Sequence, residues 1–164
     1  MDSEITFGSG RRGDLAKEIT DLHMSFYEKA SGFDHLFEQV VHSGLGEFLS
    51  RLTNSRNQIW HLRNQEGLLG SIAIDGEDLG PGIAHLRWFI VDQRLAGQGW
   101  GKKLLSQAVD FCVRSKFDEI QLWTFQGLDA ARNLYEMNRF SLVEEDQGNQ
   151  WGDVVLEQKF VRCL

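Results

Sequence analysis

The chain has 164 residues, of which 41 % are apolar and 25 % charged, so it suits one folded domain and not a disordered segment. Its formal net charge of −7 argues against a nucleic-acid binder, because that class carries a basic patch or stripe. No apolar run of about 18 residues occurs, and residues 1–14 lack the apolar centre of a signal peptide, so we expect no membrane partner.

Cysteine and histidine usage predicts neither a disulfide framework nor a metal site. The two cysteines, Cys112 and Cys163, are far apart in the sequence, and no histidine has the spacing of a metal-ligand pair. Cys112 falls on an apolar helical face, where we expect a small core residue. These features favour a reducing, cytoplasmic setting.

The first third of the chain predicts one strand and two helices. Residues 5–7 are typical of a short strand, and Asp14 follows a glycine-rich turn as a helix N-cap. Apolar residues then recur at helical spacing in two groups: Leu15, Ile19, Leu22 and Phe26, followed by Phe33, Leu36, Phe37, Val40 and Val41. We expect Gly44 and Gly46 to break or bend the second helix.

The middle of the chain is rich in strand-like segments. Residues 58–63 and 68–74 are joined by a turn of the hairpin type. Residues 83–91 form a long apolar run that is typical of a central strand. A glycine-containing loop then leads into a helix, whose apolar face consists of Leu104, Leu105, Ala108, Phe111 and Cys112.

The last third predicts a strand over residues 119–125, a helix over residues 128–138 and two closing strands over residues 140–146 and 153–160. A strand, a glycine turn, a helix and a further strand form a crossover, so strands 83–91 and 119–125 should be parallel. The other neighbouring strands should be antiparallel. The expected fold class is therefore α+β, with a mixed sheet and helices on both of its faces.

Three glycines, Gly97, Gly99 and Gly101, occupy alternate positions just before the third predicted helix. A glycine-rich turn between a strand and a helix exposes backbone N–H groups beside the positive helix terminus, and this combination binds anions, most often phosphates. The P-loop pattern does not fit, because Lys102 is followed by Lys103 and not by Ser or Thr. The dinucleotide fingerprint does not fit either, because its third glycine would fall on Lys102.

The segment Val91–Gly101 resembles the pyrophosphate loop of the GCN5-related N-acetyltransferases, the GNAT family. The family pattern is Val-x-Pro-x-x-Arg-Gly-x-Gly-x-Gly before a leucine-bearing helix, and this chain departs from it at Gln93 and Ala96. A second block, Ala131–Phe140, resembles the family pattern Ala-x-x-x-Tyr-Glu-x-x-Gly-Phe, with Arg139 where glycine is usual.

The resemblance covers nearly the whole chain, so we expect a single GNAT domain over residues 1–164 with a central sheet of six to seven strands. The chain looks most similar to the acetyltransferase half of bacterial proteins that fuse a MarR-type DNA-binding domain to a GNAT domain. The resemblance implies acetyl-CoA as cofactor and transfer of an acetyl group to an amine of a small molecule or a protein. Dimers are common in the family, which makes a homodimer an open expectation.

The resemblance also implies a cofactor site. The pantetheine arm of the cofactor would pair with the backbone at Phe89, Ile90 and Val91, and an N–H near Val91 would polarise the thioester carbonyl. The pyrophosphate would bind the loop, formed by Gly97, Gln98, Gly99, Trp100, Gly101 and Lys102. Basic charge would come from Arg94, Lys102 or Lys103. Tyr135 is the expected general acid, because a phenol has a pKa close enough to that of a thiol to protonate a departing thiolate.

The general base and the acceptor stay open at this level. Candidate bases without a supporting motif are Asp75, His85 and Glu144. Four tryptophans are expected in the core or in pocket walls: Trp60, Trp88, Trp123 and Trp151. Leu128 stands where the family often has Asn at the start of the helix predicted over residues 128–138. This departure and those at Ala96 and Arg139 keep two alternatives to an enzyme open. One is a non-catalytic acyl-CoA-binding or sensing module, and the other is a protein-interaction domain that binds no cofactor.

Overall fold

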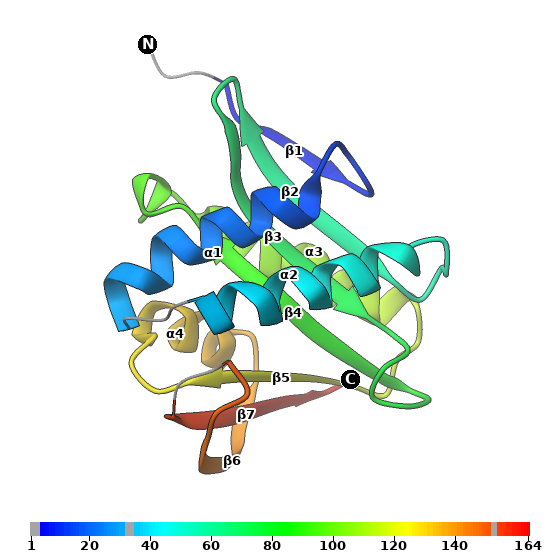
Figure 1. The fold of residues 1–164 in the computed structure, drawn as a ribbon. Helices are drawn as coiled ribbons and strands as arrows, with labels where there is room; N and C mark the ends of the chain where they lie inside the picture. Colours follow the sequence, from blue (N-terminus) through cyan, green and yellow to red (C-terminus); the bar gives the residue numbers. More distant parts are fainter. Residues whose placement is uncertain (1–3, 32–34, 152–153) are drawn as a thin grey trace.

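Seven strands form one mixed sheet that has helices on both faces, as the sequence predicts (Figure 1). The description comes from a computed structural model of the chain, which describes residues 4–31, 35–151 and 154–164. The strands are β1 Thr6–Ser9, β2 Gln58–Asn64, β3 Gly67–Asp75, β4 Ile83–Val91, β5 Glu119–Phe125, β6 Ser141–Gly148 and β7 Val155–Cys163. The α-helices are α1 Leu15–Ser31, α2 His35–Ser50, α3 Trp100–Arg114 and α4 Asp129–Met137.

The strand order in the sheet is β1-β2-β3-β4-β5-β7-β6. β4 and β5 pair in parallel and all other pairs are antiparallel, which confirms the predicted crossover through α3. β1 begins one residue later than predicted, and β7 runs on to Cys163. The extension of β7 follows from β5, because Glu119 at the start of β5 pairs with Cys163.

The two long N-terminal helices lie side by side across one face of the sheet (Figure 1). Asp14 caps α1 as predicted, since its Oδ1 accepts a hydrogen bond from the Lys17 N–H at 3.2 Å. α2 begins at His35, and Phe33, which was assigned to this helix from its spacing, lies outside the described residues.

α2 continues without interruption through Gly44 and Gly46, so the expected break at these glycines is wrong. The helix is held on the sheet by buried apolar residues on both sides of the glycines, among them Val41 and Leu45. Their burial outweighs the cost of about 1 kcal/mol that a mid-helix glycine carries. Gly44 also serves close packing, because a Cβ there would lie 3.2 Å from the guanidinium of Arg87.

Each face of the sheet carries its own apolar core. One core joins α3 and α4 to the sheet and contains Trp60 and the fully buried Cys112, as the sequence predicts for both residues. The other core packs α1 and α2 on the opposite face around Phe48 and Ile59. No helix in the described part of the chain is long and apolar enough to cross a lipid bilayer.

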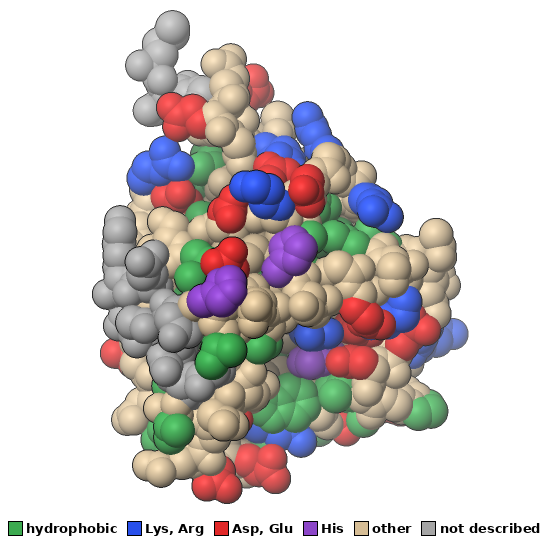
Figure 2. All heavy atoms as spheres, viewed as in Figure 1, with side chains coloured by type: hydrophobic (Ala, Val, Ile, Leu, Met, Phe, Trp, Pro, Cys, Tyr) green, Lys and Arg blue, Asp and Glu red, His purple; other side chains and the backbone are tan. Residues whose placement is uncertain are grey.

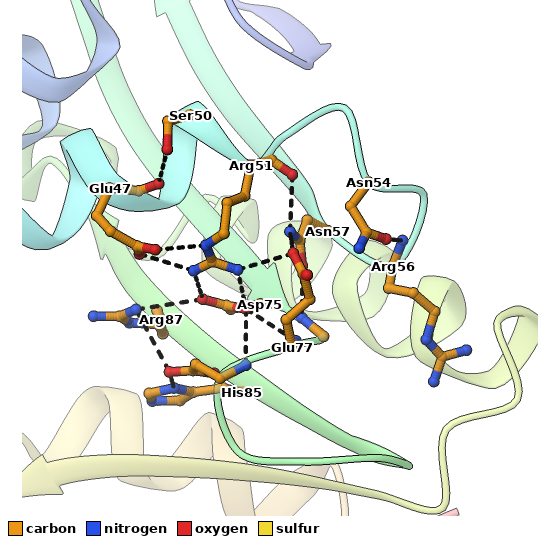
Figure 3. Close-up of polar contacts among 12 residues, drawn as sticks. Glu47, Ser50, Arg51, Asn54, Arg56, Asn57, Asp75, Glu77, His85 and Arg87 are labelled. Atoms are coloured by element: carbon orange, nitrogen blue, oxygen red, sulfur yellow. Dashed lines mark hydrogen bonds and ion pairs between the residues drawn. The ribbon is translucent and has the colours of Figure 1, made fainter.

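Asp75, at the end of β3, is a fully buried carboxylate at the centre of an ionic network (Figure 3). Its Oδ2 accepts a hydrogen bond from Arg51 Nη2 at 2.6 Å, and its Oδ1 accepts one from Nη1 at 3.1 Å. The same guanidinium donates to Glu47 and to Glu77. Backbone N–H groups of Glu77 and Asp78 also donate to Oδ1 of Asp75. One buried charge therefore fastens the end of α2 to β3 and to the loop that leads into β4.

We expect Asp75→Asn to lower the free energy of unfolding by about 2 kcal/mol, because the change removes the buried charge that binds Arg51 and leaves only Glu47 and Glu77 as its carboxylate partners. Burial raises the pKa of Asp75, but hydrogen bonds from Arg51 and the Glu77 N–H, with the charges of Arg51 and Arg87, outweigh it and lower the pKa. The stabilisation is thus complete above the unfolded pKa of about 3.9 and is lost as the pH falls through the folded pKa.

Chemical denaturation of both proteins over a pH series measures this difference and its decline in acid. Asp21→Asn is the control, because Asp21 forms an exposed ion pair with Lys17 and its loss should leave stability nearly unchanged. Equal stability of wild type and Asp75→Asn at neutral pH would contradict the role assigned to the network.

Candidate active site

β4 and β5 run side by side only over their first residues and then part. The paired residues of β4 are Ile83, Ala84 and His85, and within the described chain no later residue of β4 pairs with β5. Figure 1 shows the two strands diverging toward their C-terminal ends, where α4 follows β5. The backbone of β4 therefore borders a gap along one edge.

A β-bulge in β4 accompanies this parting. Ser71 of β3 pairs with Ile90, whereas Ala73 pairs with Arg87, so β4 has one residue more than β3 over this stretch. Trp88 lies in the bulge with a φ of 49°, a left-handed conformation that is rare for a bulky side chain. The buried hydroxyl of Ser71 donates to the Trp88 carbonyl at 2.7 Å and satisfies an acceptor within the bulge.

The last residues of β4 direct backbone groups into the gap. The Asp92 N–H donates to the carbonyl of Leu69 at 2.7 Å and so points toward β3. N–H groups of adjacent strand residues point to opposite edges, so the N–H of Val91 points away from β3 and into the gap. Phe89 and Ile90, the other two strand residues predicted to hold the cofactor, precede Val91 on the same strand.

The predicted glycine loop joins β4 to α3 with its N–H groups open. Gly97 and Gly99 have φ values of 77° and 84°, which side-chain-bearing residues rarely adopt, and Gly99 is the N-cap of α3. Several N–H groups donate to no backbone acceptor among the described residues: those of Gly97, Gly99, Trp100, Gly101 and Lys102. The N–H of Gln98 differs, because it donates to the carbonyl of Leu95 at 3.2 Å. Four consecutive open donors, from Gly99 to Lys102, form a site for an anion.

Of the three basic residues predicted near this loop, Arg94 is neutralised by neighbours. Its guanidinium lies 3.0 Å from Asp92 and 3.1 Å from Glu66. Lys102 and Lys103 are both exposed, and the Lys103 Nζ lies 5.0 Å from the ring centre of Trp100. The loop therefore attracts an anion mainly through backbone dipoles, with the two lysines at its edge.

Tyr135 on α4 lies against the gap. It is 5 % exposed, and its ring centre lies 6.0 Å from that of Phe89 on β4. Gly101 allows this approach of α4, because a Cβ there would lie 3.1 Å from Leu134. Burial raises the pKa of Tyr135, and the neighbouring Tyr27 raises it further, so the phenol keeps its proton at neutral pH.

A cavity of about 170 Å³ opens in the gap between β4 and β5. Its aromatic wall includes Tyr27, Trp88, Trp123, Tyr135 and Trp151. Of the four tryptophans expected in the core or in pocket walls, Trp60 is therefore in the core and the other three line this cavity. Its polar lining side chains are His23, His85, Arg87, Thr124 and Gln150. Figure 2 shows this face hollowed below α2, where histidine, basic and hydrophobic side chains meet. No Asp or Glu of the described residues lines the cavity.

Two histidines line the cavity with a defined tautomer. The Nδ1 of His85 donates to Asp78 Oδ2 at 2.8 Å, and the Nδ1 of His23 donates to the Ile19 carbonyl at 2.8 Å. In each neutral ring the lone pair is therefore on Nε2. Burial lowers the pKa of His23 to about 4, which makes it a poor base. His85 differs from it by its contact with a carboxylate, that of Asp78.

The other two candidate bases lie elsewhere. Asp75 is engaged by Arg51 and backbone N–H groups and is not part of the cavity wall. Glu144 is exposed on β6, at the edge of the sheet. His85 is thus the member of the predicted set that the fold brings to the cavity.

Sequence reasoning missed Arg87 and the pair His23 and Tyr27. A signal for the pair was present, because both residues continue the spacing of four that begins with Leu15 and Ile19 and so fall on the buried face of α1. Nothing in the sequence marks Arg87, since alternation along β4 is broken by the bulge beside it.

The departures from the family pattern leave the backbone shape intact. Arg139, where glycine is usual, adopts a left-handed φ of 68° after α4 and donates its N–H to the carbonyl of Glu136. Leu128 is the N-cap of α4 without a side-chain cap, and its carbonyl accepts from the Arg132 N–H. Ala96 donates its N–H to the Gln93 carbonyl at the end of a short 3₁₀ turn, Gln93–Leu95.

The two parallel strands part, and a loop with open N–H donors lies at the end of the gap between them. This arrangement suits a ligand with an extended amide-bearing arm and a diphosphate, such as coenzyme A. The fold and the site thus define a protein of the acyl-CoA-using class. The model of the acetyltransferase (GNAT) family matches residues 16–139, and the chain belongs to this family. Acetyl-CoA is the cofactor that the family uses.

Solved structures share this fold across almost their full length. PH1933 from Pyrococcus horikoshii OT3 is 22 % identical, with 98 % of this chain and 99 % of that chain covered and a TM-score of 0.75. A GNAT-family acetyltransferase from Staphylococcus aureus Mu50 is 21 % identical, with the same coverage and a TM-score of 0.74. The yncA protein of Salmonella typhimurium, solved with its cofactor acetyl-CoA, is 16 % identical over 98 % and 94 % of the two chains, with a TM-score of 0.74. No curated protein matches.

We expect Gly99→Ala to weaken binding of acetyl-CoA about tenfold, measured by isothermal titration calorimetry. Alanine disfavours the left-handed conformation at this position by about 1–2 kcal/mol, so the loop N–H groups would turn away from their common focus. Gly10→Ala is a matched control, because Gly10 has a φ of 83° and equally open surroundings in the turn before α1. Both variants should lose similar stability, and equal losses of affinity would contradict the role of the loop.

Proposed function

We propose that the protein is an acetyl-CoA-dependent N-acetyltransferase that acetylates an amine of a small molecule or a protein. The observation that carries the proposal is the gap between β4 and β5. It has the open-donor loop at its end, and a protonated phenol and the imidazole of His85 lie along its wall, with Asp78 behind the imidazole. Proton donors and acceptors at one site are what acyl transfer to an amine requires.

The residues that would hold the cofactor form a continuous path. The edge of β4 at Phe89, Ile90 and Val91 does not pair with β5. The pantetheine arm would bind along this edge in the way that an added strand pairs with a sheet. The loop residues Gly97, Gly99, Trp100, Gly101 and Lys102 offer N–H groups to the pyrophosphate, and Gln98 offers its side chain. When bound, acetyl-CoA supplies the thioester that carries the acetyl group.

Three groups of the chain would share the chemical work. The Val91 N–H polarises the acyl carbonyl, and His85 Nε2 takes a proton from the attacking amine. The nitrogen–carbon bond forms, the carbon–sulfur bond breaks, and the hydroxyl of Tyr135 protonates the departing thiolate. Asp78 orients the His85 ring through the hydrogen bond that it accepts from Nδ1. The proton given up by Tyr135 is restored from the solvent.

Several finer expectations from the sequence accompany this proposal and stay predictions. They are the likeness to the acetyltransferase half of MarR–GNAT fusion proteins, the cytoplasmic location, the absence of nucleic-acid and membrane partners, and the homodimer. Size-exclusion chromatography with light scattering measures the last of them directly.

We expect wild-type protein to release free thiol from acetyl-CoA in the presence of an accepted amine, and Tyr135→Phe to lower kcat about 100-fold. Phenylalanine keeps the ring that packs against Phe89, Phe140 and Phe160, so affinity for acetyl-CoA and thermal stability should stay near wild type. Thiol release over an amine panel, calorimetry and thermal unfolding measure the three quantities.

Parallel losses of affinity and kcat in this variant would point to a packing role for Tyr135. Tight acetyl-CoA binding by the wild type without thiol release from any amine would favour the acyl-CoA-sensing module. No binding of any coenzyme A species would leave the protein-interaction domain as the remaining alternative.

We expect His85→Gln to lower kcat/KM for an accepted amine about 100-fold, because the variant lacks the group that takes the proton of the amine. Glutamine keeps a polar side chain beside Asp78 but accepts no proton at neutral pH. His42→Gln is the control, because His42 is exposed on α2 and does not line the cavity. A kcat/KM of His85→Gln within threefold of the wild-type value would assign the base to another group.

A further inference from the structure

Arg87 presents unused hydrogen-bond donors to the cavity. Its side chain lines the cavity and is 25 % exposed. Its nearest carboxylate oxygens, on Asp75 and Asp78, lie 3.5 Å and 3.7 Å from the same nitrogen, Nη1, and both distances exceed a normal hydrogen bond. In Figure 3 the other terminal nitrogen points away from these two acids and has no dashed line to any of the residues drawn.

The guanidinium is nevertheless held in place. It lies flat against its neighbour, with Cζ 4.0 Å from the ring centre of Trp88. On its other side Gly44 of α2 leaves the space that Nη2 occupies, since a Cβ there would lie 3.2 Å from this nitrogen. Burial lowers the pKa of Arg87, although the charges of Asp78, Asp75 and Glu47 oppose this change. A fixed, partly buried guanidinium with open donors is a site for a carboxylate.

The carboxylate site and the base lie close together. His85 and Arg87 are two residues apart on β4 and both line the cavity. They share one acceptor, because Asp78 Oδ2 lies 2.8 Å from His85 Nδ1 and 3.7 Å from Arg87 Nη1. A ligand held by both would carry its amine and its carboxylate a short distance apart, as an α-amino acid does with one carbon between them.

The remaining wall selects the side chain of such a ligand. Tyr27, Trp88, Trp123 and Trp151 are aromatic, and no Asp or Glu of the described residues lines the cavity. A polyamine or a second cationic group would find no counter-charge there, whereas a flat apolar side chain would find aromatic faces.

We propose that the acceptor is an aromatic α-amino acid, whose carboxylate binds Arg87 and whose amine lies toward His85. The proposal rests on the acetyl transfer proposed above. The products are an N-acetyl amino acid and coenzyme A with a free thiol, and the step needs no oxidant or reductant. The amine loses its proton to His85 as the nitrogen–carbon bond forms, and the thiolate gains one from Tyr135.

Matched acceptor pairs test the proposal through thiol release. We expect kcat/KM for L-tryptophan and L-phenylalanine to exceed that for tryptamine and 2-phenylethylamine at least tenfold, and L-alanine to be poor. Arg87→Gln should lower kcat/KM for the two amino acids about 100-fold, because it removes a charged hydrogen-bonding partner, and change it less than threefold for the two amines. Arg56→Gln is the matched control, since Arg56 also stacks on a ring, that of Phe117 at 3.8 Å, but lies outside the cavity.

A binding measurement separates this inference from the proposed reaction. Calorimetry with N-acetyl-L-tryptophan in the presence of coenzyme A should give binding to wild type and to Arg56→Gln, and at least tenfold weaker binding to Arg87→Gln. If no amine releases thiol but this pattern holds, the carboxylate site stands and the acetyl transfer fails. Turnover of tryptamine equal to that of L-tryptophan, or equal binding by wild type and Arg87→Gln, would overturn the proposed acceptor.

Discussion

The parting of β4 from β5 is the constraint on which the rest of the site depends. Two parallel strands that stayed paired would satisfy each other's backbone and leave no room between them. Here pairing ends at His85, and the bulge at Trp88 is stabilised by the buried hydroxyl of Ser71. The gap that results exposes the Val91 N–H, admits Tyr135 from α4 and opens the cavity toward α1 and α2. The backbone at the bulge is therefore as much a part of the site as the side chains around it.

The second constraint is the ionic network around Asp75, which connects the helix layer to the cavity wall. Arg51 at the end of α2 binds Asp75, and the N–H of Asp78 donates to the same carboxylate. Asp78 in turn accepts from His85. The orientation of a residue in the cavity is thus set by a buried charge that does not touch the cavity. The hydrogen bond to Asp78 therefore holds the His85 imidazole in a single tautomer, and no contact with a ligand is needed for this.

Local patterns in the sequence predicted most of the fold. The apolar pattern predicted β4 and β5 with their observed ends, and the alternate glycines predicted a turn with open N–H groups before α3. Both signals depend on neighbouring residues alone. The cavity wall was less predictable, since His23, Arg87 and Trp151 come from separate elements that meet only in the folded chain. The continuity of α2 through Gly44 was missed for the same reason, as burial against the sheet overrides the helix propensity of one residue.

The contrast between the charge of the whole chain and that of the anion loop has a kinetic consequence. The chain carries a net charge of −7, whereas the loop has two exposed lysines at its edge, and Arg94 beside it is compensated by Asp92 and Glu66. A polyanion such as coenzyme A is therefore repelled while it diffuses toward the protein and is attracted only on reaching the amide dipoles and these two lysines. Dissolved ions screen the distant repulsion more than the contact attraction. Association of the cofactor accordingly quickens as salt is added, the reverse of the behaviour of a basic groove.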